Sequence, residues 1–273
     1  MPKTIEEIEF TIFDTETTGL APQSGDRIVE IAALRFKGTE RIAAFQSLVN
    51  PRRPISEAAY QVNKISQEMV DGAPDMQKVM PGFLEFIKGS CLCSYNAGFD
   101  LEFLDNELKI LNQPPLEGVV VVDILKMARR LLPGIERYAL WFVADQLGIR
   151  TQQEHRAFSD VELTFGVFHK LKNVLHAKGA VDFVSFSHLF SINPRLLEDI
   201  TNQKLVQIQE AIDLGVRLKI KYLSSSGAEV TDREVTPREI RRENNRHYMV
   251  GFCNLRQDER MFRLDGILSL EVI

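Results

Sequence analysis

Residues 10–19 read FTIFDTETTG, and the interpretation of the whole chain starts from this stretch. An apolar run leads into Asp14 and Glu16, and a Thr-Thr-Gly turn follows. If the run is a strand, Asp14 and Glu16 lie two residues apart and their side chains point to the same face. Neighbouring carboxylates repel each other unless a cation lies between them, and oxygen ligands suit Mg²⁺ or Mn²⁺. The pattern therefore predicts either a cation site at a sheet edge or a solvated strand end.

Two further acidic residues lie at the starts of predicted helices. Asp100 falls in the first turn after an Asn-Ala-Gly turn, and Asp160 falls in the first turn of a later helix with His155 in the preceding loop. A carboxylate in this position is stabilised by the helix dipole and the free amide groups. Each residue taken alone therefore fits a helix cap or an exposed loop histidine as well as it fits a functional site.

The order of strand and helix patterns predicts an α/β fold with a mixed sheet flanked by helices. Strands are expected at 10–13, 27–36, 42–49, 91–95 and 119–122, and helices at 77–88, 99–111, 124–132, 138–147 and 157–175. The predicted domains are residues 1–176, a helical or irregular connector at 177–205, and a tail at 206–273. The tail alternates apolar and charged residues between turns at 225–227, 244–245 and 256–259, which is typical of a small β-barrel or sandwich.

Length and composition narrow the class of protein. The chain has 273 residues, of which 44% are hydrophobic and 26% charged, as expected for about two globular domains. No apolar run is long enough to span a bilayer, no signal peptide is visible, and three cysteines exclude a disulfide framework, so a cytoplasmic location is expected. The net charge of −5 provides no global attraction for nucleic acid, so phosphate contacts must be local. His169, His176 and His188 lack carboxylate neighbours in the sequence and are predicted at the surface.

Three motifs in order resemble the DEDDh family of 3′–5′ exonucleases, which includes the epsilon proofreading subunit of bacterial replicative polymerase and ribonuclease T. These motifs are FDTETTG, NAGFD and HRAFSD, and the resemblance covers roughly residues 8–175. It implies a ribonuclease-H-like sheet on which Asp14, Glu16, Asp100 and Asp160 gather two divalent cations, Mg²⁺ or Mn²⁺. Asp14 would bridge both cations, Glu16 and Asp160 would complete the nucleophile-side site, and Asp100 would act on the second cation. His155 would be the general base.

The same resemblance places the terminal nucleotide of the substrate. The residues implied for this role are Thr15, Thr17, Leu20, Asn96 and Phe99. One position departs from the family. Many relatives carry a histidine in a V-H-G-I segment that contacts the 3′-terminal nucleotide, where this chain has Asn63. Asn63 can still donate a hydrogen bond, but the contact with the terminal nucleotide is expected to differ.

The tail resembles the WYL domain, a small SH3- or Sm-like β-barrel found in bacterial regulators and nucleic-acid enzymes. The matching text runs from VRLKIKYL to FRLDGILSLEVI, although the signature tripeptide is His-Tyr-Met here. Its candidate nucleic-acid contacts are basic residues, namely Arg217, Lys219, Lys221, Arg256, Arg260 and Arg263. The tail carries as many acidic as basic residues, so a solvated strand face is the alternative.

The predicted function is a metal-dependent 3′–5′ exonuclease acting on single-stranded ends, with DNA favoured and RNA possible. The tail would bind nucleic acid or a regulatory ligand such as a small nucleotide, and a DNA polymerase or repair complex is a candidate partner. The alternative is a non-catalytic regulatory protein that senses nucleic acid or nucleotides on a nuclease-like scaffold.

Overall fold

The computed structural model describes residues 3–149, 155–179, 182–224 and 229–273. Its larger part is a five-stranded sheet with strand order β3-β2-β1-β4-β5. The strands are β1 (Glu9–Thr17), β2 (Ile28–Lys37), β3 (Glu40–Leu48), β4 (Cys91–Ser94) and β5 (Val121–Asp123). The first three are antiparallel, whereas β4 and β5 run parallel to β1. The predicted mixed sheet is therefore confirmed, as is the placement of its strands to within a few residues.

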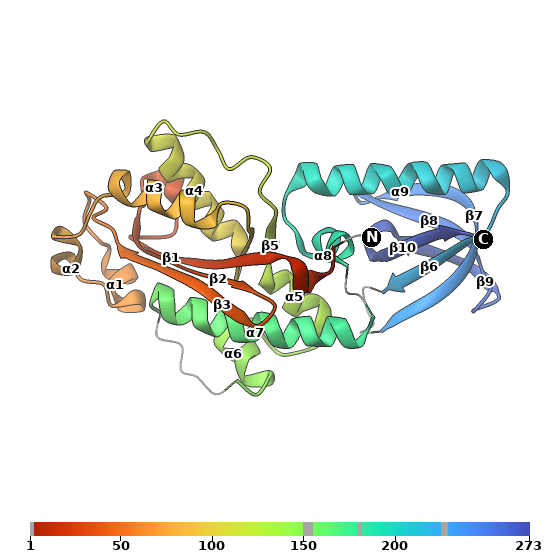
Figure 1. Cartoon of the computed structure of the whole chain (residues 1–273), viewed down its shortest axis with the longest axis horizontal. Helices are drawn as coiled ribbons and strands as arrows, with labels where there is room; N and C mark the ends of the chain where they lie inside the picture. The colour runs from red at the N-terminus through yellow and green to blue at the C-terminus, as the bar shows by residue number, and fades with distance from the viewer. Residues whose placement is uncertain (1–2, 150–154, 180–181, 225–228) are drawn as a thin grey trace.

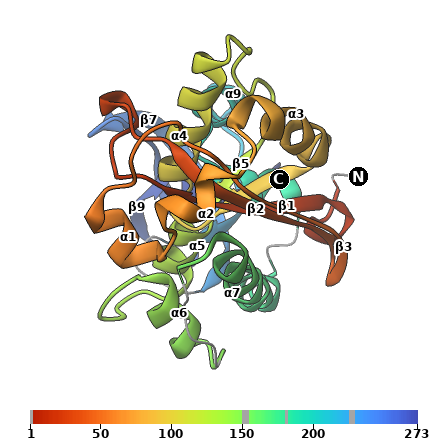
Figure 2. The same ribbon diagram turned by 90° about the vertical axis from the view of Figure 1, so that its left-hand side faces the viewer.

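Helices cover both faces of this sheet (Figures 1 and 2). They are α1 (Glu57–Asn63), α2 (Gln67–Asp71), α3 (Met76–Ile87), α4 (Ala97–Ile110), α5 (Ile124–Leu131), α6 (Leu140–Gln146) and α7 (Ala157–Ala177), with short 3₁₀ turns at Ile5–Glu7 and Pro22–Ser24. The apolar side chains of α3 and α4 form one core with the sheet, and those of α5, α6 and α7 form the other. The near-continuous apolar sequences of β2 and β4 follow from this burial on both faces.

The C-terminal part is a second sheet with strand order β10-β6-β7-β8-β9, in which every paired neighbour is antiparallel. Its strands are β6 (Leu218–Leu223), β7 (Val230–Glu243), β8 (Arg246–Cys253), β9 (Asp258–Arg263) and β10 (Ile267–Val272). Within the described ranges β9 and β10 do not pair, so the antiparallel sheet is confirmed and closure into an SH3- or Sm-like barrel is not. Asn244 and Asn245 form the predicted turn between β7 and β8 with positive φ angles, while the turn predicted at 225–227 falls outside the described residues.

Two helices join the sheets. α8 (Phe183–Phe190) packs between them, and α9 (Pro194–Leu214) runs along the second sheet and through the boundary predicted at 205/206 (Figure 1). Ile208 and Ala211 of α9 belong to the core of the second sheet. Leu223 and Leu268 of that sheet instead belong to the core beneath α5 and α7, so the two parts share buried apolar surface. No helix in the described ranges is both long and apolar enough to cross a bilayer.

Candidate active site

Asp14 and Glu16 lie on the part of β1 that extends beyond its shorter neighbour, β4. β1 is the central strand of the sheet. Its parallel pairing with β4 covers only three residues and ends at Ile12, opposite Cys93. From Asp14 onward β1 is paired on the β2 side alone, so Asp14 and Glu16 project at an opening created by the short β4. Because the carboxyl ends of parallel strands meet at the same edge of a sheet, loops that follow them can reach this opening.

Helix α7 brings the third carboxylate to the same place. Asp160 lies in the first turn of α7 and is 5% exposed. Carboxylate oxygens of Asp14, Glu16 and Asp160 all lie within 4.8 Å of one another. The structure thus brings together side chains separated by more than 140 positions in the sequence, and such an all-oxygen set is the donor chemistry preferred by Mg²⁺ and Mn²⁺.

The surroundings of these carboxylates disfavour negative charge. Burial, together with the charges of Asp100, Glu16 and Asp160, raises the pKa of Asp14 well above its usual range. Burial and the charge of Asp160 raise the pKa of Glu16 to about 8. Cations at this cluster would offset both the repulsion and the lost hydration, so the residues present fit a divalent metal site.

Asp100 is tied to β1 from the opposite side. It lies in the first turn of α4, is 2% exposed, and its Oδ1 accepts hydrogen bonds from the Thr15 amide (3.0 Å) and the Thr15 hydroxyl (2.7 Å). The Ser94 hydroxyl at the end of β4 donates to Oδ2 at 2.5 Å. Burial raises the pKa of Asp100 to about 6 even though these donors oppose the shift. Asp100 is therefore next to the cluster and contributes to its field, but it is not one of the three converging ligands.

The candidate general base lies at the rim. His155 is exposed and has a positive φ of 52°. It directly precedes Arg156, the N-cap residue of α7, so the same helix start carries both His155 and Asp160. Residues 150–154 are outside the described ranges.

A residue that the sequence analysis missed holds this helix start in place. Glu30 of β2 is paired in register with Glu16 and is fully buried. Its carboxylate accepts two hydrogen bonds from the Arg156 guanidinium (2.8 and 3.0 Å) and one from the Ala157 amide (3.1 Å). Burial opposes its ionisation, but these donors and Gln46 outweigh that effect and lower the pKa of Glu30. We name Glu30, Arg156 and Ala157 the α7 clamp. The sequence feature that could have identified Glu30 is its position as the lone charged residue within the apolar run IVEIAAL at 28–34.

The predicted substrate-side residues fall into two groups. Leu20 is 83% exposed at the turn after β1, Asn96 is exposed as the N-cap of α4, and Phe99 is half-buried against Phe103, with 5.0 Å between ring centroids. These side chains flank the opening at the end of β1 and are open to a ligand.

The second group is buried and structural. The Thr15 hydroxyl is bound to Asp100, and the Thr17 hydroxyl donates to the Gly19 carbonyl at 2.6 Å. Asn63 is 2% exposed, and its amide donates to the Thr17 carbonyl at 3.3 Å. These residues shape the end of β1 from beneath.

The basic residues predicted in the tail are dispersed. Arg217, Lys219 and Lys221 are exposed along β6, but Lys219 is paired in register with Glu234 and Glu271, and Arg217 lies 3.3 Å from Glu234. Arg256 and Arg260 are exposed near β9. Arg263 is half-buried and engaged in a bidentate ion pair with Asp265.

Comparisons with known proteins agree with this geometry. Residues 11–168 match the exonuclease family and residues 203–272 match the WYL domain. The chain is 39% identical over 165 residues to the DNA polymerase III subunit epsilon of Treponema pallidum, which covers 60% of this chain and 76% of that protein. It is 32% identical over 237 residues to the PolC-type DNA polymerase III of Caldanaerobacter subterraneus, covering 85% of this chain but only 16% of that much longer protein.

A solved structure of exonuclease X in complex with 5′ overhanging duplex DNA is 28% identical, with a TM-score of 0.50 over 62% of this chain and 93% of that one. The resemblance predicted from FDTETTG, NAGFD and HRAFSD is confirmed, as is the WYL match. This chain belongs to the exonuclease family and carries a WYL domain after its nuclease fold.

Proposed function

We propose that this chain is a 3′–5′ exonuclease that hydrolyses the terminal phosphodiester bond of single-stranded nucleic acid, with DNA as the favoured substrate. The observation that carries the proposal is the convergence of Asp14, Glu16 and Asp160 within 4.8 Å at the open end of β1. The family match and the full set of DEDDh residues support it, and they weigh against a scaffold that only binds nucleic acid.

Each acidic residue has a distinct part in this proposal. Asp14, Glu16 and Asp160 would hold divalent cations, Mg²⁺ or Mn²⁺, with Asp14 shared between two ions and Asp100 acting on the second from beneath. When bound, such ions lower the pKa of water and stabilise charge on a leaving oxygen. His155 would accept the proton of the attacking water, because it is exposed at the rim and sits on the same helix start as Asp160.

The substrate end would be seated by the exposed group around this opening. Leu20 offers an apolar surface 83% open to solvent, and Phe99 offers a half-buried aromatic ring in the first turn of α4. A nucleobase stacked on such side chains is held without sequence preference. The epsilon-subunit relative favours association with a DNA polymerase, and the relative bound to 5′ overhanging duplex DNA favours a DNA end.

A cleavage assay tests the proposal directly. Oligonucleotides labelled at the 5′ end should give a ladder that shortens from the 3′ end in Mg²⁺ or Mn²⁺, and EDTA should abolish it. Asp14→Ala should reduce the rate by at least roughly 10³-fold, because the shared cation ligand is lost. Cleavage by Asp14→Ala at the parental rate would overturn the metal assignment, and matched DNA and RNA oligomers would rank the two substrates.

For the tail we propose an accessory nucleic-acid contact along β6. Arg217, Lys219 and Lys221 alternate outward on one strand face, which suits successive phosphate groups. Replacing all three with Gln should weaken oligonucleotide binding. It should also reduce the slope of log K against log salt concentration by the equivalent of up to about three phosphate contacts. Unchanged affinity at every salt concentration would favour a solvated face.

We also propose that the domains divide at residues 176 and 206, with α8 and most of α9 as the connector.

A further inference from the structure

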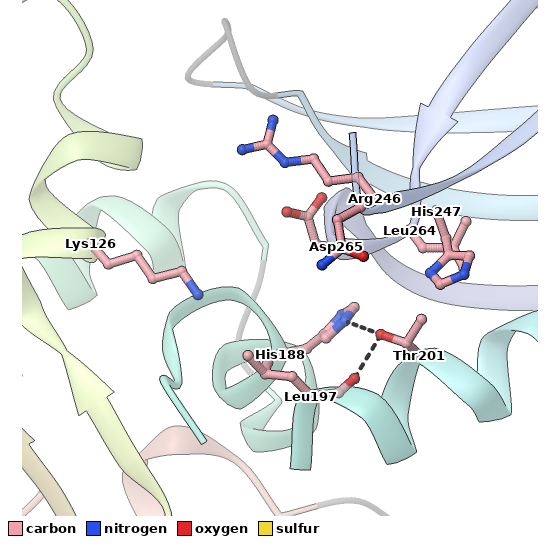
Figure 3. A pocket seen from close by; sticks show the side chains of 9 residues that line it. Lys126, His188, Leu197, Thr201, Arg246, His247, Leu264 and Asp265 are labelled. Carbon is pink, nitrogen blue, oxygen red and sulfur yellow. Dashed lines mark hydrogen bonds between the residues drawn. The ribbon is translucent and has the colours of Figure 1, made fainter. Parts of the chain in front are cut away.

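A cavity lies between the nuclease domain and the tail, away from the cluster of carboxylates (Figure 3). It has a volume of about 190 Å³, several times the ~30 Å³ that a water occupies in the liquid. Its lining comes from three parts of the chain: Lys126 of α5, His188, Leu197 and Thr201 of α8 and α9, and Asn245, Arg246, His247, Leu264 and Asp265 of the tail. The site exists only because the two domains are packed together.

His188 of α8 lines this cavity, and its Nε2 is directed at the Thr201 hydroxyl (Figure 3). The sequence predicted His188 at the surface, but it is 4% exposed, because Lys204 of α9 covers it and donates from Nζ to its Nδ1 at 2.8 Å. Burial and the Lys204 charge lower the pKa of His188 to about 3, so the ring is neutral and its proton is on Nε2. The nearest partner of Nε2 is the Thr201 hydroxyl at 3.5 Å, a long contact, and Thr201 itself donates to Leu197 (Figure 3).

Two cationic groups face the same cavity from opposite domains. Lys126 reaches in from α5, and its only hydrogen bond in the described part of the chain is to the Ser191 carbonyl at 3.0 Å. Arg246 extends from the start of β8, and no described residue hydrogen-bonds or ion-pairs with its guanidinium group. Figure 3 shows Lys126 pointing into the cavity from α5 and Arg246 extending across its top, with the Asp265 carboxylate between Arg246 and His188 in this view.

The single carboxylate of the cavity is already neutralised. Asp265 accepts a bidentate pair from Arg263 and lies 3.7 Å from Arg130 of α5. With Lys126, Arg246 and Lys204 nearby, the junction holds more positive than negative charge. Burial lowers the pKa of Lys126, and it lowers that of Lys204 to about 8, because both ammonium groups lose hydration at the junction. An anion beside Lys126 would replace part of the lost hydration.

We propose that the junction cavity binds a phosphate monoester, with its dianion held between Lys126 and Arg246. A monoester carries about −1.5 to −2 charges near pH 7 and has three acceptor oxygens, which matches two cationic hydrogen-bond donors. Inorganic phosphate and a 5′-mononucleotide share this chemistry, and the Leu197, Leu264 and His247 side chains could cover the nucleoside. The proposal does not depend on the exonuclease assignment.

Calorimetric titration of the full-length chain in EDTA tests the site. Without cations the Asp14 cluster repels phosphate, so binding reports on the junction. Inorganic phosphate and deoxycytidine 5′-monophosphate should each bind at one saturable site and compete, while deoxycytidine should not bind. Lys126→Met and Arg246→Met should each weaken binding by about tenfold or more, as expected for losing a charged hydrogen bond. The matched control is Lys109→Met, which removes an exposed cation of α4 outside the cavity and should change affinity less than about twofold.

Several results would overturn the proposal: no saturable binding of either phosphate compound, equal binding of deoxycytidine, or equal weakening by Lys109→Met. Asn245→Asp is a further test variant that is expected to keep the fold, because Asp accepts the same hydrogen bond from Arg242 and tolerates the positive φ of 60°. It adds a negative charge at the rim without removing a contact and should also weaken binding several-fold. A nucleotide that binds much more tightly than inorganic phosphate would identify the nucleotide as the ligand, and equal affinities would identify the phosphate group alone.

Discussion

Glu16 carries a stability effect whose sign depends on pH and on metal. Its pKa is raised from 4.5 to about 8 in the folded protein, first by burial and then by Asp160. The protonated form is therefore favoured by folding, so this contribution is complete below about pH 4.5 and is lost as the pH rises through about 8. In EDTA the melting temperature should fall by several degrees between about pH 5 and pH 8.

Mn²⁺ should restore more stability at about pH 8 than at pH 5, since it takes the place of the protons. Differential scanning fluorimetry checks both effects, and Glu16→Gln, which cannot titrate, should flatten the pH dependence in EDTA. A metal-free protein whose melting temperature rises over this range would contradict the assignment.

The α7 clamp makes a second prediction at the level of single residues. Glu30→Gln keeps the shape of the side chain but removes the charge that holds Arg156 in two hydrogen bonds. Asp160 and His155 should then be placed less accurately, so kcat should fall by about tenfold or more while KM for the oligonucleotide stays near the parental value. The Mn²⁺ affinity measured by calorimetry should weaken as well.

Gln46→Ala is the matched control for the clamp. Gln46 is exposed and donates to Glu30 at 3.1 Å, but it has no hydrogen bond to a described residue of α7. Its kinetics and Mn²⁺ affinity should remain within about twofold of the parent. If both variants lose activity equally, Glu30 supports the sheet rather than the helix start.

At the scale of an element, the turn after β1 packs Gly19 so closely against the Asp26 carboxylate that a side chain at position 19 has no room. A Cβ on Gly19 would lie 2.3 Å from Oδ2 of Asp26, whose carboxylate accepts hydrogen bonds from Thr18 and Ala21. Gly19→Ala should therefore displace Asp26 and with it the exposed Leu20, costing about 1–3 kcal/mol of stability. We expect KM for the oligonucleotide to rise more than kcat falls.

Steady-state kinetics and denaturant unfolding check this prediction. Gly72→Ala is the control, since no atom lies within 4 Å of a Cβ built there and its φ of −90° suits alanine. If Gly19→Ala behaves like Gly72→Ala, the turn has no part in holding the strand end.

The elements and the acidic positions could largely be predicted from the sequence, because both depend on local spacing. Asp14 and Glu16 share a face by strand periodicity, and Asp123, an aspartate directly before a helical pattern, caps α5 by accepting from the Leu125 amide at 2.9 Å. Contacts between distant segments could not be predicted. Glu30 meets Arg156 across 126 positions, and His188 is buried only because Lys204 packs over it. The central position of β1 likewise depends on β4, which follows much later in the chain.

At the scale of the whole molecule, the two domains should unfold together. Ser185 of α8 donates to the Leu268 carbonyl at 2.6 Å, Arg130 of α5 donates to the Leu223 carbonyl at 3.1 Å, and both leucines are part of the nuclease core. Calorimetry of the full chain should show one cooperative transition. Truncation after residue 205 should lower the melting temperature of the nuclease domain, since it exposes that core. Two separate transitions in the full chain would contradict this coupling.

The three hydrogen bonds that Asp100 accepts have a consequence for how this protein could lose its activity through evolution. Because Thr15 and Ser94 already satisfy its oxygens, Asp100 joins β1, β4 and α4 before any metal arrives. Glu16 interacts instead with the Asn63 side chain of α1, and no described residue of β4 or α4 is hydrogen-bonded to it. A descendant that had abandoned cleavage could thus drift freely at Glu16, whereas drift at Asp100 would be removed by selection for a folded chain. A homologue that keeps Asp100 therefore need not be an active nuclease, whereas a homologue that has lost Glu16 is expected to be inactive.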